Sequence, residues 1–199
     1  GFPMAAGHEL AGIVVEAGEN VPDFIRVGMQ VTRVGRLCGV CADCRSGRTS
    51  SCTHGASLYA LQKDGFYGAK NFANYIVSNP RNVIPVDNSV PPAVAALAEP
   101  ASGAVFAMKK ACVQPGESVV ILGAGPMGLL NAQVAHAFGA RVILSEPDRI
   151  RVEKAKAMGV CEVIDAGETD PVKELFRLTR GVGADVVIPV VGLTNAYRQ

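Results

Sequence analysis

The sequence predicts an α/β protein with a β-rich first half and a doubly wound parallel sheet in its second half. Up to residue 100, short apolar runs alternate with Gly, Pro and Asn. Beyond it, strand-like and helix-like segments alternate, which is typical of βαβ units. A glycine-rich turn joins the first strand of that second half to the helix that follows it. These three observations determine the predicted fold class.

In the first half, three runs rich in Val, Ile and Tyr are strand-like, at residues 11–16, 29–34 and 73–77. Clusters of Gly, Asn, Asp and Pro, which favour turns, stand at 18–20, 79–80 and 85–88. We therefore expect a compact β-rich domain with irregular loops, covering residues 1–101.

In the second half, the expected elements follow one another closely. We predict strands at 118–122, 141–145, 162–165 and 184–191, helices at 104–111, 126–138, 148–158 and 171–179, and a turn at 114–117. Asp148 is the expected N-cap of the third helix, Gly159 lies just past its end, and Gly139 ends the second. This order predicts a parallel sheet in a domain covering residues 102–199.

Composition excludes several classes of protein. The formal charge is +1 with no basic block, so we expect no nucleic-acid partner. Residues 121–140 carry no formal charge and have the length of a membrane span, but their glycines and proline favour a strand, a turn and a helix. No secretory signal is visible, so we expect a cytoplasmic protein without a membrane partner. We expect both ends to be cuts through a longer protein.

Four of the six cysteines share one short segment, at Cys38, Cys41, Cys44 and Cys52. The spacing C-x2-C-x2-C-x7-C lets a small loop surround one ion with four thiolates, which makes a closed structural zinc site. Disulfides are one alternative, disfavoured without a secretion signal. An iron–sulfur cluster is another, but the spacing differs from common ferredoxin patterns. Cys112 and Cys161 stand alone in apolar segments, and we expect both to be buried packing residues.

The segment 118–128 carries the pattern G-x-G-x-x-G at Gly123, Gly125 and Gly128. It follows a predicted strand and opens a predicted helix, which is the context of a dinucleotide-binding turn. The first glycine allows the tight turn, the second lets the backbone approach a pyrophosphate, and the third lets the helix pack close to the strand. The N–H groups of the helix start then face the phosphates.

Glu146 ends the second predicted strand, about 20 residues past the turn, where a carboxylate accepts hydrogen bonds from the adenosine ribose. It also repels a 2′-phosphate, and Pro147 follows where an NADP enzyme often carries a cation. These features favour NAD over NADP. Arg149 and Arg151 keep NADP open as the alternative.

Two further positions are ambiguous on local grounds. His8 stands just before a predicted strand, and a lone histidine is more often structural than a ligand. Glu99 is a single acid in an apolar run, either a charge at a helix start or an acid that meets a cation or a metal.

Together, these motifs resemble the zinc-containing medium-chain dehydrogenase/reductase family. Gly7-His8-Glu9-x-x-Gly12, the four-cysteine loop, Ala98-Glu99-Pro100 and the glycine turn stand in that family's order and spacing, along essentially the whole chain. Glu99-Pro100 resembles the polyol branch (sorbitol, threonine and butanediol dehydrogenases). The resemblance implies a GroES-like catalytic domain and a Rossmann domain, both incomplete in this chain.

The resemblance also implies roles for individual residues. His8 is a ligand of the catalytic zinc, and Glu9 and Glu99 are further ligands, direct or through water. The implied cofactor-binding residues are Gly123, Gly125, Pro126, Met127, Gly128, Glu146, Arg151 and Val191. The implied partners are a small alcohol or polyol substrate and further copies of the chain, in a dimer or tetramer.

The expected reaction is hydride transfer between a secondary alcohol and NAD, with zinc as Lewis acid. Either Glu9 or Glu99 can move the proton. The family's first catalytic ligand is a cysteine upstream of Gly7 that this chain does not contain, which we interpret as truncation. The alternatives are a zinc-free reductase of the same superfamily, disfavoured by His8, Glu99 and the cysteines, and a non-catalytic NAD-binding scaffold or sensor. Polyols, their phosphates, threonine and vicinal diols all remain possible substrates.

Overall fold

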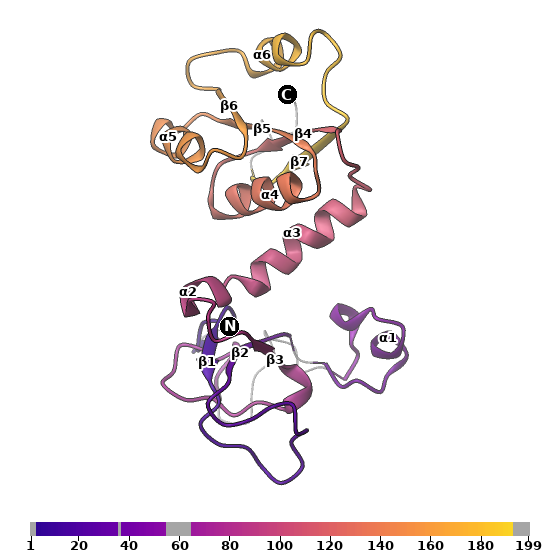
Figure 1. Cartoon of the computed structure of the whole chain (residues 1–199), viewed down its shortest axis with the longest axis vertical. Coiled ribbons are helices and arrows are strands. Elements are labelled where there is room, and N and C mark those ends of the chain that lie inside the picture. Colours follow the sequence, from indigo (N-terminus) through magenta and orange to yellow (C-terminus); the bar gives the residue numbers. More distant parts are fainter. Residues whose placement is uncertain (1–2, 36, 55–64, 193–199) are drawn as a thin grey trace. The chain divides into compact units, whose positions relative to one another are not determined.

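The computed structural model describes residues 3–35, 37–54 and 65–192. The chain divides into two compact units, Gly1–Glu99 and Pro100–Gln199. The first contains an antiparallel sheet and the second a parallel sheet, as Figure 1 shows. The expected α/β fold class is therefore confirmed.

The sheet of the first unit has the order β1-β2-β3, with β1 at Ala11–Ile13, β2 at Gln30–Arg33 and β3 at Val83–Val86. The first two strands lie inside predicted ones and are shorter. The third overlaps residues 85–88, which we predicted as a turn, so that prediction is wrong for its first two residues. Pro85 lacks a backbone N–H, and β3 tolerates it because β3 is an edge strand of this sheet.

Buried polar side chains fasten this sheet to its surroundings. Gln30 is almost fully buried, and its Nε2 donates to the backbone oxygens of Asp87 at 3.2 Å and Val90 at 2.8 Å. The hydroxyl of Thr32, also buried, donates to the backbone oxygen of Leu10 at 2.8 Å. These bonds hold the segment after β3 and the segment before β1 against the central strand.

The remaining elements of the first unit are short: α1 (Ala42–Arg45), α2 (Pro92–Ala95) and 3-10 turns at Thr49–Ser51 and Pro80–Asn82. The predicted strand at 73–77 is wrong. Tyr75 and Val77 have largely or fully exposed side chains. Within the described residues, no strand pairs with this segment, and a strand forms only where a neighbour completes its ladder of hydrogen bonds.

Helix α3 (Ala98–Lys110) begins six residues before the predicted start at 104. Its first turn contains Glu99 and Pro100. Proline fits there because the first N–H groups of a helix have no partner within the helix. The carboxylate of Glu99 is favourable at the same end because it faces the positive end of the helix dipole.

The parallel sheet has the order β6-β5-β4-β7. Its strands are β4 (Ser118–Leu122), β5 (Arg141–Glu146), β6 (Glu162–Asp165) and β7 (Val186–Pro189), and its helices are α4 (Pro126–Ala137), α5 (Arg149–Met158) and α6 (Pro171–Leu178). The chain moves outward from β4 to β6 and returns to place β7 on the other side of β4. This reversal creates a switch point at the carboxyl ends of β4 and β7, where such sheets bind ligands.

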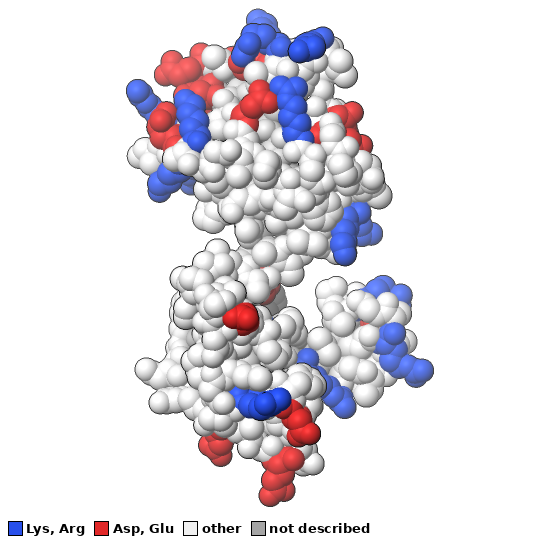
Figure 2. Space-filling view, viewed as in Figure 1, with Lys and Arg blue, Asp and Glu red and all other residues white. Residues whose placement is uncertain are grey.

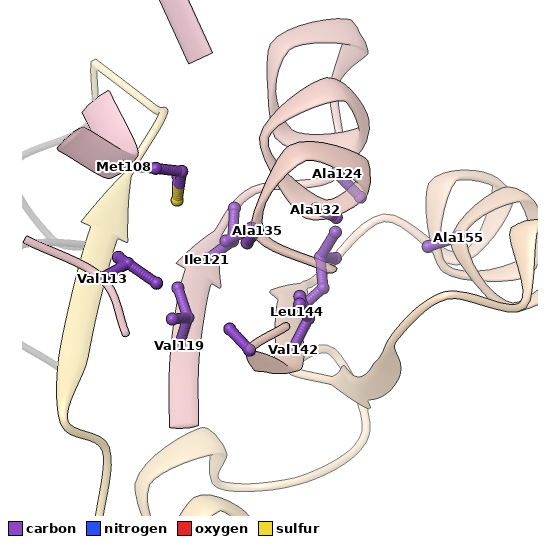
Figure 3. Packing of buried hydrophobic residues seen from close by; sticks show 11 residues of the cluster. Met108, Val113, Val119, Ile121, Ala124, Ala132, Ala135, Val142, Leu144 and Ala155 are labelled. Carbon is purple, nitrogen blue, oxygen red and sulfur yellow. The ribbon is translucent and has the colours of Figure 1, made fainter. Parts of the chain in front are cut away.

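Both faces of the parallel sheet are buried. One face, drawn in Figure 3, packs against α4 and the last turn of α3; its members include Met108, Val119, Ile121, Ala132, Ala135, Val142 and Leu144. The other face packs against α6; its members include Val120, Leu122, Ile143, Ile164, Leu175 and Leu178. Burial on both sides explains why these strands are nearly continuous runs of Val, Ile and Leu.

The predicted ends of α5 are confirmed. Asp148 accepts a hydrogen bond from the backbone N–H of Arg151 at 3.0 Å, and Gly159 ends the helix with a φ of 72°. Cys161 packs against the core, and burial raises the pKa of its thiol. Cys112, in contrast, is exposed with a φ of 55°, so the prediction of burial is wrong. It follows the C-terminal end of α3, where the chain turns through a left-handed conformation.

Cationic and anionic side chains intermix over the second unit on the face drawn in Figure 2. Among the helices that the structure describes, none combines the length and the apolar character needed to cross a bilayer.

Candidate metal centres and nucleotide-binding turn

The four clustered cysteines converge on one point. Their Sγ atoms all lie within 4.8 Å of one another, and two pairs, Cys38–Cys44 and Cys41–Cys52, are 3.9 Å apart. A Zn–S bond of about 2.3 Å in a tetrahedron separates the sulfurs by roughly 3.8 Å. A disulfide requires about 2.05 Å. The thiols therefore fit a tetrahedral metal site, and all four are free cysteines.

The backbone of this loop favours thiolates at two of the four positions. The N–H of Cys44, in the single turn of α1, lowers the pKa of Cys41 to about 5. The N–H of Cys38 similarly lowers the pKa of Cys52. Partial burial instead raises the pKa of Cys44 to about 11. Because a metal binds the thiolate form, the loop presents one ligand, Cys41, that is deprotonated near neutral pH beside another, Cys44, that a metal must deprotonate.

Two arginines shape the loop. The Nη2 of Arg48 lies 2.9 Å from Oδ1 of Asp43, which joins α1 to the residue that precedes the 3-10 turn at Thr49–Ser51. The Nη1 of Arg81 donates to the backbone oxygen of Cys38 at 2.9 Å. Nothing in the cysteine spacing predicts these contacts.

The second cluster joins His8, Glu9 and Glu99. The Nε2 of His8 lies 3.9 Å from a carboxylate oxygen of each glutamate, and the three ligand atoms lie within 4.8 Å of one another. These distances exceed a hydrogen bond. One imidazole and two carboxylates form a donor set that suits zinc, and three protein ligands leave a position for substrate. About half of the His8 side chain is exposed, so the cluster is accessible.

The conformation of Gly7 sets the position of the backbone that carries His8. Its φ is 89°, and an added Cβ would lie 2.7 Å from the ring of Phe72. Only glycine fits this conformation and this contact. Neighbouring backbone bonds, from Phe72 N to Ala6 O and from Asn71 N to Gly7 O, hold the segment in place.

The glycine turn lies at the carboxyl end of β4. Gly123 has a φ of 106°, and an added Cβ would meet the side chain of Val191. A Cβ on Gly128 would overlap the backbone oxygen of Gly123. Gly125, the N-cap of α4, has open space around it and supplies no capping side chain, and Pro126 follows at the first helical position. The helix start thus combines close packing with an open approach for an anion.

Glu146 lies at the end of β5, beside this turn. Its side chain is buried, its Oε2 accepts the N–H of Ala124 at 2.6 Å, and its Oε1 accepts the N–H of Asp148 at 2.9 Å. The guanidinium of Arg151 lies 3.9 Å from the same Oε2. The spacing from the glycine turn predicted the position of this carboxylate, but not its hydrogen bond to Ala124.

The structure thus brings the predicted residues together in three groups: the four cysteines, the trio of His8, Glu9 and Glu99, and the residues around the glycine turn. Met127 is part of the third group, and 40% of the residue is exposed.

Family models match both units. The model for "Alcohol dehydrogenase GroES-like domain" matches residues 1–88, and that for "Zinc-binding dehydrogenase" matches residues 126–199. A sorbitol dehydrogenase of Halalkalibacterium halodurans is 38% identical over 202 residues, covering 99% of this chain and 57% of the relative. An L-threonine 3-dehydrogenase of Pyrococcus abyssi is 40% identical over 199 residues, covering 99% and 55%. The chain spans about half the length of the curated relatives it matches.

Solved structures agree with these matches. The alcohol dehydrogenase TADH from Thermus sp. ATN1 has a TM-score of 0.84 at 27% identity, covering 98% of this chain and 57% of that one. A putative zinc-binding dehydrogenase from Sinorhizobium meliloti 1021, bound to NADP, has a TM-score of 0.80 at 29% identity, covering 99% and 57%.

Proposed function

This chain belongs to the zinc-dependent medium-chain dehydrogenase/reductase family, and from that premise we propose that the full-length protein oxidises a secondary alcohol of the polyol type with NAD. The observation that carries the proposal is the convergence of His8, Glu9 and Glu99. They come from opposite ends of the first unit's sequence and present a mixed nitrogen and oxygen donor set.

In this proposal, His8 holds a catalytic zinc, with Glu9 and Glu99 as direct or water-mediated partners. Such an ion supplies a Lewis acid that lowers the pKa of a substrate hydroxyl. Both glutamates are partly exposed, so either can accept the hydroxyl proton and pass it to solvent. A bound nicotinamide would supply the acceptor for the hydride released by the carbinol carbon, which would complete a two-electron oxidation.

The four-cysteine loop would hold a second, structural zinc. Its sulfur spacing fits a closed tetrahedron, which leaves no position for substrate. Its proposed role is to stabilise residues 38–52.

The nucleotide would bind at the switch point of the parallel sheet. Gly123, Gly125 and Gly128 would approach the pyrophosphate, with Pro126 and Met127 at the helix start. Val191 would lie toward the nicotinamide, and Glu146 and Arg151 would hold the adenosine ribose. The buried carboxylate of Glu146 supports NAD over NADP because a 2′-phosphate would meet a negative charge.

Zinc content and turnover of the full-length protein test the proposal. We expect two zinc ions per chain by elemental analysis, and NADH formation with sorbitol, threonine or a vicinal diol. His8→Ala should lose one zinc and turnover but keep NADH binding, because His8 lies outside the nucleotide-binding unit. A His8→Ala variant as active as the wild type would refute the catalytic assignment.

The other outcomes separate the alternatives. One zinc per chain without turnover would favour a non-catalytic scaffold. Reduction of activated double bonds without zinc would favour the zinc-free reductase. Light scattering on the same sample tests the expected dimer or tetramer.

A further inference from the structure

We propose that Glu146 is a positioning residue that clamps the phosphate-binding turn, in addition to the ribose contact proposed above, on which this inference rests. The ribose contact concerns only the adenosine sugar. The clamp concerns the turn that receives the pyrophosphate, which every dinucleotide carries.

Three contacts carry the proposal. The Oε2 of Glu146 accepts the N–H of Ala124, the residue between the first two glycines of the turn, at 2.6 Å. Its Oε1 accepts the N–H of Asp148, the N-cap of α5, at 2.9 Å. Gly123, next to Ala124, donates its own N–H to the backbone oxygen of Ser145 at 2.8 Å. The end of β5 and the glycine turn are therefore fastened by two adjacent hydrogen bonds.

Burial increases the energetic importance of the hydrogen bond between Glu146 and Ala124. Glu146 and Ala124 are 3% and 2% exposed, so water cannot replace either partner. Hydrogen bonds to ionised groups are stronger than neutral ones, and leaving a buried donor unsatisfied is costly. Arg151 Nη1 lies 3.9 Å from the same Oε2 and places a positive charge beside the carboxylate.

The side chain of Ala124 packs in the core, but the backbone on either side of it consists of glycines. Gly123 and Gly125 flank it, and glycine restricts the backbone least of all residues. A carboxylate that holds the N–H between two glycines removes this freedom before the ligand arrives. The preorganised turn then binds the pyrophosphate without the cost of ordering it.

A cycle of protein and ligand changes separates the clamp from the ribose contact. The ligands are NAD and an NAD analogue whose adenosine ribose lacks both the 2′- and the 3′-hydroxyl. The proteins are the full-length wild type, Glu146→Ala and Glu146→Gln. Gln offers one oxygen, so one of the two N–H groups would face an amide nitrogen. Val142→Ala, a cavity in the core of the same strand, is the control for general destabilisation.

If the clamp exists, Glu146→Ala binds the dideoxy analogue about 10-fold to 100-fold more weakly than the wild type does, with Glu146→Gln in between. Val142→Ala should lower the thermal midpoint yet bind the analogue like the wild type. Equal affinity of wild type and Glu146→Ala for the analogue would overturn the clamp. An equal loss of affinity for the analogue in Val142→Ala, at matched stability, would also overturn the clamp.

Amide hydrogen exchange of Ala124 in the ligand-free protein gives a second readout. The clamp predicts at least about tenfold faster exchange in Glu146→Ala than in Val142→Ala. Equal rates would contradict it. If the wild type bound neither nucleotide, the proposed use of NAD would fail, and the exchange rates alone would decide the clamp.

Discussion

Two glycines of the nucleotide turn should respond differently to the same added methyl group. In Gly128→Ala the new Cβ overlaps the backbone oxygen of Gly123, so backbone must move. Overpacking of this kind costs about 1–3 kcal/mol. Alanine is better than glycine inside a helix by up to about 1 kcal/mol, which offsets part of the loss. We expect a net destabilisation of about 1–2 kcal/mol.

In Gly125→Ala the Cβ meets nothing within 4 Å, and the φ of −67° suits any residue. We expect a loss of less than about 1 kcal/mol, because alanine is a poorer N-cap than glycine. The methyl group would, however, stand where the pyrophosphate is proposed to approach, so NADH affinity should fall at least about tenfold.

Thermal melting without ligand and fluorescence titration with NADH check both expectations. Gly128→Ala should melt a few degrees below the wild type, whereas Gly125→Ala should melt close to it and bind NADH poorly. A Gly128→Ala variant as stable as the wild type would refute the packing argument. Unchanged NADH affinity in Gly125→Ala would refute the proposed approach of the phosphates.

Three further predictions follow from single contacts. After zinc is removed with a chelator, alkylation at pH 7 should modify Cys41 before Cys44, as mass spectrometry of the peptides would show. The lowered pKa of Cys41 keeps it a thiolate down to about pH 5, and its reactivity should fall as the pH drops through that value. Cys44, with its raised pKa, should gain reactivity only toward about pH 11. Gly103→Ala should stabilise the protein by about 0.5–1 kcal/mol in thermal melting, because Gly103 lies inside α3 with open space around it. Thr32→Val should destabilise it by about 1–3 kcal/mol in denaturant titration, because the backbone oxygen of Leu10 loses its donor in a buried place.

The parallel sheet could be predicted closely because its signals are local. Strands buried on both faces are continuous apolar runs, and β4 and β6 have the predicted bounds. Asp148 begins α5 by accepting a hydrogen bond with its side-chain oxygen, and Gly159 ends it in a left-handed conformation. Both roles are typical of these residue types and can be predicted from the sequence.

The first unit was harder because its strands depend on partners. Pro85 indicated a turn, but an edge strand tolerates a missing N–H, so β3 was missed. The run 73–77 has strand-like composition without a paired neighbour among the described residues. The start of α3 was placed too late because the first turn of a helix accepts Pro100.

The site residues also divide into those with a local sequence signal and those that depend on distant partners. Cysteine spacing and glycine spacing located two clusters from short segments. His8 and Glu99 are ambiguous by themselves, and only the family resemblance brought them together before the structure did. The contacts of Arg81 with Cys38 and of Glu146 with Ala124 join residues distant in sequence, which no local pattern reveals.

The shortness of the cysteine loop limits how far a metal bound there would stabilise the whole protein. Cross-linking a loop of about 15 residues restricts the unfolded chain by roughly 3 kcal/mol, and that restriction acts on the loop itself. Beyond the loop, the side chain of Arg81 is its described tether, whereas Gln30 and Thr32 hold the sheet through other partners. We therefore expect residues 38–52 to open as a separate cooperative segment, with trypsin cutting after Arg45 and Arg48 while the sheet stays folded.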